Sequence, residues 1–256
     1  TFAKGLRAVW TGSIKDLHFY HFEVRLYESG TKVQTFTLKD LETYKDEIEA
    51  ARKVLSVDNF DATVKPSGEA LNGQLTLEPG ESEALFDLDQ PGEITQLTLQ
   101  LKTGDMHHML RQVILEGYFD DAPRPQIESP LGDFFSSAPG VIPQQTLPIS
   151  VAPDGTMTCR FVMPFAAKAR FVLTNTDTET AEIDGTIHVT ETPWDPERSM
   201  YFFAKWRVNH GLIAGGGPDS IDLPFLNARG KGVYVGTASI MNNVTPVVTG
   251  GGGWWG

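Results

Sequence analysis

Cysteine is nearly absent from this sequence, which has one, Cys159, among 256 residues. An intrachain disulfide is therefore excluded, although this leaves the compartment unknown because many exported proteins also lack disulfides. Long apolar runs are missing as well, and no stretch approaches the roughly 20 residues that a membrane helix requires. We expect a protein that does not enter a membrane, with Cys159 as a small buried side chain and not a nucleophile.

Positive charge is also scarce. The chain has 21 Lys and Arg against 33 Asp and Glu, which gives a formal net charge of −12 and an isoelectric point of about 4.9. Such a surface repels phosphate backbones, and the sequence shows no basic cluster that would offset the repulsion. Nucleic acid is therefore not expected as a partner.

The patterns of nucleotide, metal and serine-hydrolase sites are missing too. The glycine runs at 215–217 and 250–253 lack the Lys-Ser/Thr of a phosphate-binding loop. His107 and His108 are adjacent, and on a strand they would point to opposite faces, so that one ion would not reach both. No nucleophile elbow surrounds a serine. The sequence predicts no cofactor and no metal site.

Short runs of alternating apolar and polar residues dominate what is present, and turn residues such as Pro79-Gly80 and Pro91-Gly92 separate them. Many short strands at this spacing indicate an all-β sandwich or jelly roll. We expect strands at Leu17–Tyr27, Leu71–Leu77, Ala84–Leu88, Ile94–Leu101, Leu110–Phe119, Met157–Phe165, Lys168–Thr174, Ile183–Thr190, Met200–Val208 and Gly232–Ile240.

One helix interrupts this pattern, over about residues 38–55. Its apolar residues recur at steps of three and four, which places them on one face. Thr37 and Asp40 have the spacing of a capping box at its start. The opposite face is charged, and we interpret it as solvated surface.

The segment Ile127–Phe135, Ile-Glu-Ser-Pro-Leu-Gly-Asp-Phe-Phe, is the best candidate for chemistry. Pro130 restricts the approach to the turn and Gly132 permits unusual backbone angles, so that Asp133 would be presented beside an aromatic wall. Carboxylates next to aromatic faces are typical of sugar sites, but an interface hydrogen bond explains the pattern equally well. For Asp120 and Asp121, a solvated turn is the simpler interpretation.

Several segments in this order resemble glycoside hydrolase family 172, long called domain of unknown function 2961. They are Glu128-Ser-Pro-Leu-Gly-Asp-Phe-Phe135, Met163-Pro-Phe165, Lys168-Ala-Arg-Phe171, Tyr201-Phe-Phe-Ala-Lys-Trp-Arg207, Gly230-Lys-Gly-Val-Tyr-Val-Gly236 and Trp254-Trp-Gly256. The resemblance implies a double jelly-roll β-sandwich with one notable helix. Residues 1–60 would be the end of the first jelly roll with its connecting helix, and residues 61–256 a second jelly roll that is incomplete at its C-terminus.

The resemblance also implies a function. Characterised family members are retaining hydrolases of α-D-fructofuranosyl or D-arabinofuranosyl linkages, assembled as homotrimers or homohexamers. Their catalytic glutamates lie in motifs that follow Trp-Trp-Gly, so none is assigned within this chain, and we expect both beyond Gly256. Substrate or interface contacts are instead expected from Glu128, Asp133, Phe134, Phe135, Trp206, Arg207, Trp254 and Trp255.

Two other interpretations remain open at this point. The chain would be a non-catalytic, self-assembling double jelly roll of a fibre or shell, which needs no catalytic glutamates. It would alternatively be a free carbohydrate-binding module, although 256 residues is large for one. The sequence beyond Gly256 separates the enzyme from the assembly protein.

Overall fold

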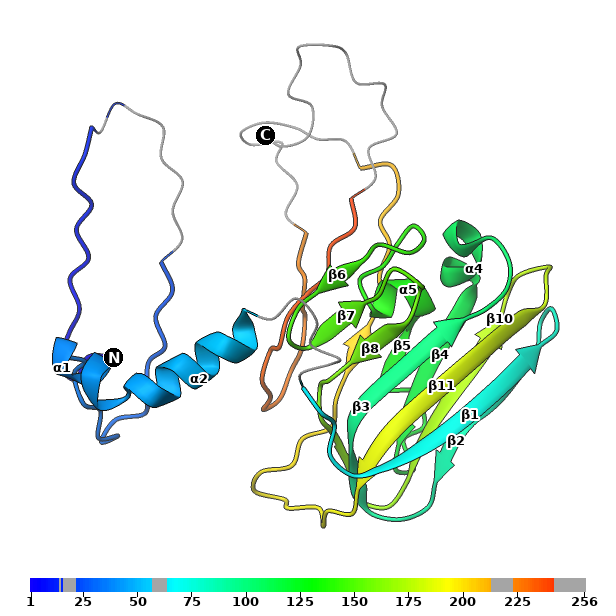
Figure 1. Cartoon of the computed structure of the whole chain (residues 1–256), viewed down its shortest axis with the longest axis horizontal. Coiled ribbons are helices and arrows are strands. Elements are labelled where there is room, and N and C mark those ends of the chain that lie inside the picture. The colour runs from blue at the N-terminus through cyan, green and yellow to red at the C-terminus, as the bar shows by residue number, and fades with distance from the viewer. Residues whose placement is uncertain (14, 16–21, 57–63, 213–222, 242–256) are drawn as a thin grey trace. The chain divides into compact units, whose positions relative to one another are not determined.

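The computed structural model describes residues 1–13, 15, 22–56, 64–212 and 223–241. The chain divides into two units, Thr1–Ser56 and Val57–Gly256. Helix α1 (Leu38–Thr43) and helix α2 (Lys45–Leu55) lie in the first unit. The second unit holds the strands, and Figure 1 shows its two sheets one behind the other.

The helix expected over residues 38–55 is present in two pieces, because Tyr44 leaves helical geometry between them with φ −110° and ψ 27°. The capping box is confirmed, since the Thr37 N–H donates to Oδ2 of Asp40 at 2.6 Å. Neither helix has a buried residue. The described part of Leu17–Tyr27, residues 22–27, contains no strand.

The larger sheet of the second unit has seven strands in the order β1-β11-β3-β8-β7-β6, with β9 also paired to β3. The smaller sheet has five, in the order β12-β5-β4-β10-β2. The strands are β1 (Glu69–Leu77), β2 (Ser82–Leu88), β3 (Gly92–Leu101), β4 (Val113–Phe119), β5 (Ile127–Pro130), β6 (Gln144–Gln145), β7 (Ile149–Val151), β8 (Met157–Cys159), β9 (Met163–Phe165), β10 (Ala169–Asn175), β11 (Ala181–Thr190) and β12 (Ala204–Lys205).

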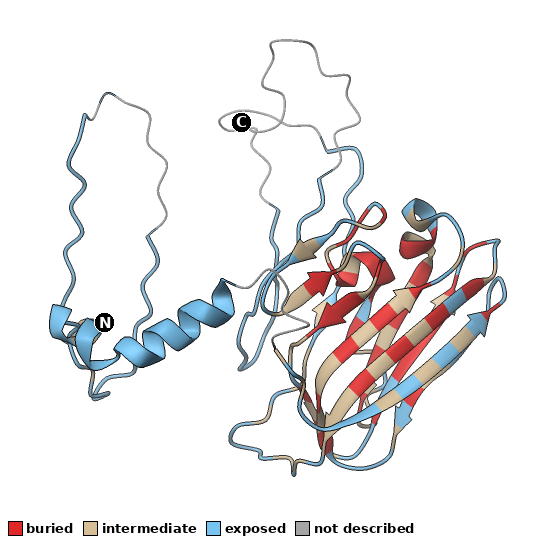
Figure 2. Cartoon of the chain, in the orientation of Figure 1, coloured by how far each residue is buried: buried red, intermediate tan, exposed pale blue. Residues whose placement is uncertain are grey.

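The hydrophobic core lies between the two sheets, as the alternating red bands of Figure 2 show. Alternate residues of β3 and β4 point inward and are buried, because side chains of a strand alternate between its faces. Phe119 and Phe171 meet edge to face, with ring centroids 6.0 Å apart. Cys159 is fully buried in this core, and burial raises the pKa of its thiol to about 12. The expected all-β sandwich is therefore confirmed.

Two paired glycines bring the sheets close together at one side. Gly73 of β1 lies opposite Gly185 of β11. A Cβ at Gly73 would lie 2.8 Å from Leu85 of β2, and a Cβ at Gly185 would lie 2.6 Å from the same side chain. Leu85 therefore fills the space that the two glycines leave.

Several expected strands differ from the structure. The segment Leu110–Phe119 begins inside helix α4 (Met106–Gln112) and becomes strand only at Val113. Met157–Phe165 is two short strands, and Met200–Val208 pairs only at Ala204–Lys205. No strand forms at Gly232–Ile240. Apolar alternation alone did not distinguish a helix turn or an extended loop from a paired strand.

The second unit thus contains one two-sheet sandwich among its described residues. The double jelly roll and the boundary near residue 60 remain predictions. None of the described helices is both long enough and apolar enough to span a membrane.

Candidate functional site

Asp133 lies at the centre of the candidate site, in the one-turn helix α5 (Leu131–Phe134) that follows β5. Its side chain is 7% exposed. The indole Nε1 of Trp206 donates to Oδ1 at 3.0 Å, and Nε of Arg111 lies 3.1 Å from Oδ2. The Arg111 guanidinium also stands over the Trp206 ring, 5.6 Å from its centroid. The three side chains therefore form one mutually contacting cluster.

Main-chain pairing brings Trp206 to this cluster from far along the sequence. Strand β12 pairs in parallel with β5, with Ala204 opposite Ile127 and Lys205 opposite Glu128. The Trp206 N–H continues the pairing by donating to the Glu128 carbonyl at 3.2 Å. This register places Trp206 beside the turn that carries Asp133.

The electrostatics of Asp133 are those of a carboxyl group removed from water. Burial raises the pKa of Asp133, and the Arg111 charge and the Trp206 hydrogen bond only partly lower it. Oδ2 is buried and accepts no hydrogen bond, since its 3.1 Å contact with Arg111 is an ion pair without hydrogen-bond geometry. The carboxyl group holds the indole and the guanidinium together at the surface, where Trp206 remains 39% exposed.

Gly132 serves this turn in a way that the sequence did not suggest. It has no positive φ, so the expected unusual backbone angle is absent. A Cβ at this position would instead lie 2.4 Å from the Ser137 carbonyl oxygen. Glycine is needed here because the chain passes too close for any side chain.

The other predicted site residues lie in different surroundings. Glu128 is exposed and pairs with Lys205, whose Nζ is 2.7 Å from Oε2. Arg207 donates to the Pro224 carbonyl at 3.0 Å. Phe134 and Phe135 meet edge to face in the hydrophobic core, so they pack beneath the turn and form no exposed aromatic wall. Trp254 and Trp255 lie outside the described residues.

Sequence reasoning missed Arg111 and Lys205. Arg111 lay in a segment interpreted as strand, although Asp105 is a good helix N-cap residue and its side chain does accept from the His107 N–H at 3.0 Å. Recognising that cap would have placed Arg111 on a helix. Lys205 has no comparable signal, because its partner is 77 residues away.

Asp120 is a second carboxylate with many contacts, and its role is structural. It accepts hydrogen bonds from the N–H groups of Ala166, Ala167 and Lys168 and from the Tyr201 hydroxyl. Burial alone would raise the pKa of Asp120, but these hydrogen bonds outweigh it and lower the pKa. The expected solvated turn holds only for Asp121, whose side chain is 93% exposed.

The paired histidines lie on helix α4 and not on a strand. His108 Nδ1 is 2.8 Å from Oδ2 of Asp177, which ties the helix to the turn after β10. Among the residues that the structure describes, no group of three or more His, Cys, Asp or Glu is placed to hold a metal ion. His108 is thus accounted for by a pairwise contact.

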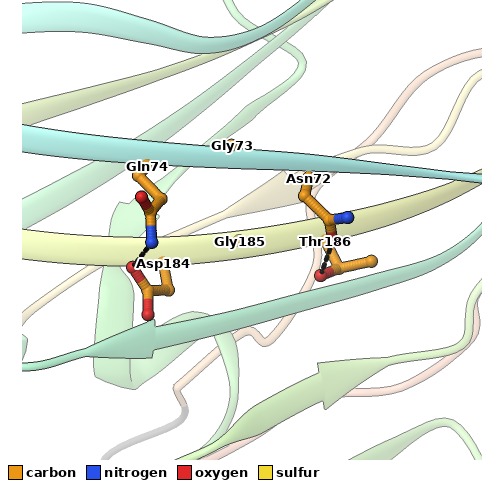
Figure 3. A pocket seen from close by; sticks show the side chains of 6 residues that line it. All are labelled: Asn72, Gly73, Gln74, Asp184, Gly185 and Thr186. Carbon is orange, nitrogen blue, oxygen red and sulfur yellow. Dashed lines mark hydrogen bonds between the residues drawn. The ribbon is translucent and has the colours of Figure 1, made fainter.

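A shallow hollow of about 470 Å³ lies on the outer face of the larger sheet, over β1 and β11 (Figure 3). Gln74 donates to Asp184 at 3.0 Å, and Thr186 donates to Asn72 at 2.8 Å. No aromatic ring lines it. Because sugar sites commonly offer an aromatic face for stacking, the cluster at Asp133 is the better candidate for a sugar contact.

Comparison with known proteins gives one family match. Residues 68–187 match a family model described as GH172 domain-like. No curated protein matches the chain. A crystal structure of Aeromonas hydrophila PliG, a periplasmic lysozyme inhibitor of g-type lysozyme, aligns with 48% of this chain and 88% of its own at 8% identity, with a TM-score of 0.26. That score is too low to support any inference about fold or function.

Proposed function

Starting from residues 68–187 as a GH172 domain-like region, we propose that this chain is the sugar-contacting part of a retaining furanoside hydrolase. The substrates would be α-D-fructofuranosyl or D-arabinofuranosyl linkages, and the two catalytic glutamates would come from outside residues 1–256. The observation that supports this proposal is the exposed Trp206 indole held by the buried Asp133 carboxyl group and flanked by Arg111.

Each member of the cluster has a distinct part in holding a sugar. The exposed Trp206 face stacks on the apolar face of a furanose ring, and the Arg111 guanidinium offers hydrogen-bond donors to its hydroxyl groups. Asp133 is a positioning residue, because its carboxyl oxygens face Trp206 and Arg111 and are removed from solvent. In retention, one carboxylate attacks the anomeric carbon while a carboxylic acid protonates the leaving oxygen, and water then releases the glycosyl group.

A second candidate function is a self-assembling, non-catalytic sandwich. It is favoured by the open edge of strand β1, with which no other described strand pairs on its outer side. This function would need neither Trp206 nor Arg111 at the surface. Substitutions at these two residues should therefore weaken sugar binding if the first candidate function is correct, and leave assembly unchanged if the second is correct.

Titration with furanosides tests the sugar contact on the chain as it stands. We expect isothermal titration calorimetry to show that methyl α-D-arabinofuranoside or a fructofuranosyl disaccharide binds to the wild-type protein. Trp206→Ala should weaken the affinity about tenfold, because it removes the stacking surface. Trp194→Phe is the matched control, since Trp194 stacks on Tyr201, with ring centroids 4.5 Å apart, and not on Arg111.

The enzyme proposal is tested on the full-length product of the gene with aryl furanosides. Hydrolysis with a raised KM in the Trp206→Ala variant supports it. Absence of any furanoside hydrolysis, or equal affinity for sugar in the wild-type and Trp206→Ala proteins, would contradict it.

A further inference from the structure

Strand β1 forms a long open edge of the larger sheet. It has nine residues, Glu69–Leu77, and lies last in the strand order beside β11. Figure 1 shows it in cyan at one side of the sheet. Strand edges present unpaired N–H and C=O groups that pair readily with another strand, and proteins usually protect them.

The sheet edges at β6, β12 and β2 are protected. Strands β6 and β12 have two residues each, which is too short to serve as a template. Strand β2 carries Glu83 and Asp87, and its pairing with β10 is interrupted by a bulge between Phe171 and Val172. Charges, bulges and short length are the usual protections of an edge.

Strand β1 has none of these protections. Its nine residues pair with β11 in one unbroken register, from Glu69 opposite Val189 to Leu77 opposite Ala181. It contains no lysine, arginine or proline, and its one charged residue is Glu69 at its start. Leu71 and Leu75 are only partly buried against the core. The edge is therefore regular, nearly uncharged and apolar on its inner side.

We infer that β1 pairs antiparallel with β1 of a second copy of this chain, about a two-fold axis at Gly73. The sequence Glu-Ala-Leu-Asn-Gly-Gln-Leu-Thr-Leu is self-complementary in this register. Leu71 faces Leu75 of the copy on the inner side, and Asn72 faces Gln74 of the copy on the outer side. Directly opposite side chains of antiparallel strands lie close enough to interact, so the leucines pack on one side and the amide groups can hydrogen-bond on the other.

Charge does not oppose the pairing of two copies at this edge. The chain carries a net charge of −12, so two copies repel each other over most of their surface. At β1 the register sets Glu69 against Leu77 of the copy, and no like charges meet. A one-residue slip would set inward residues against outward ones, which the half-buried leucines oppose. This inference rests on the edge alone and is independent of any sugar.

Sedimentation velocity of the 256-residue chain tests the pairing. We expect the wild type to sediment at an even multiple of its monomer mass of 28.2 kDa, two copies for the pair alone or six for a homohexamer built from three such pairs. The double variant Asn72→Lys, Gln74→Lys sets lysine against lysine twice across the axis and should raise the dimer dissociation constant at least about tenfold. The lysine introduced in place of Gln74 would still lie opposite Asp184 within the chain, so the sandwich keeps a favourable contact.

The matched control differs from the double-lysine variant only at residue 72. Asn72→Glu with Gln74→Lys sets glutamate against lysine across the axis and should remain dimeric. A monomeric wild type overturns the inference, as does an equal oligomeric mass for the lysine pair and the wild type. If circular dichroism shows that the double-lysine variant does not fold, hydrogen exchange of the wild type tests the pairing of β1 instead. Protection of the β1 amides must rise with protein concentration, and concentration-independent exchange overturns the pairing.

Discussion

Asp120→Ala should lower the free energy of unfolding by about 3 kcal/mol, because hydrogen bonds to a charged carboxylate are among the stronger ones and their donors would be left without it. The lost acceptor serves three successive N–H groups, at residues 166–168, and the Tyr201 hydroxyl. Alanine would also keep the positive φ of 54° that residue 120 adopts, which disfavours it. Urea unfolding followed by circular dichroism measures the change.

Asp121→Ala is the control, because the neighbouring carboxylate is 93% exposed and has only a 3.7 Å ion pair with Lys168. Exposed ion pairs contribute little, so we expect a change within about 0.5 kcal/mol. Equal effects of the two substitutions would show that Asp120 does not join the end of β4 to the loop before β10.

The contribution of Asp120 should also depend on pH. Its pKa is lowered in the folded protein, since the hydrogen bonds outweigh burial. Asp120 therefore holds its proton less tightly in the folded protein than in the unfolded chain, where its pKa is 3.8. The stabilisation is complete above that value and is lost as the pH falls through the folded pKa. The stability difference between the wild type and Asp120→Ala should shrink on acidification, and a constant difference would refute the assignment.

Gly132→Ala should destabilise the protein by about 3 kcal/mol, a large value for adding one methyl group. The new Cβ would lie 2.4 Å from the Ser137 carbonyl oxygen and 3.0 Å from Leu110 Cβ. Neither atom is the end of a flexible side chain, so the turn itself must move. Thermal unfolding should report the loss, and tryptophan fluorescence should shift as Asp133 moves relative to Trp206.

Gly232→Ala separates this effect from the general consequence of removing a glycine. No atom lies within 4 Å of a Cβ at residue 232, and its φ is not positive. The substitution should leave the melting temperature nearly unchanged. A Gly132→Ala protein as stable as Gly232→Ala would mean that the close approach to Ser137 is relaxed at little cost.

Much of the fold could be predicted from local patterns. The alternation at Leu71–Leu77, Ile94–Leu101 and Ile183–Thr190 corresponds to β1, β3 and β11, because a strand with one buried face needs that period. The pattern failed at Leu110, which lies in helix α4 although its neighbours alternate as a strand would. It also failed at residues 232–240, where alternation occurs without a pairing partner among the described residues.

Only part of the candidate site could be predicted from the sequence. Asp133 was identified from its neighbours Gly132 and Phe134, which are local, whereas its contacts are not. The family resemblance also indicates Trp206, but not its contact with Asp133, which is 73 residues away, and Arg111 lies on a helix that the alternation concealed. The sequence likewise did not determine which aromatic residues are exposed. Phe135 is fully buried in the structure, whereas Trp206 is not.

By itself, the sequence determined the all-β class, the acidic surface, the family resemblance and the turn that carries a carboxyl group. These depend on composition and on neighbours within a few residues. The tertiary structure alone decided that β12 docks beside β5, that Asp120 joins two loops and that the edge of β1 stays open. Those features depend on which distant segments meet, and strand pairing is specified by the packing of the whole sandwich rather than by any single segment.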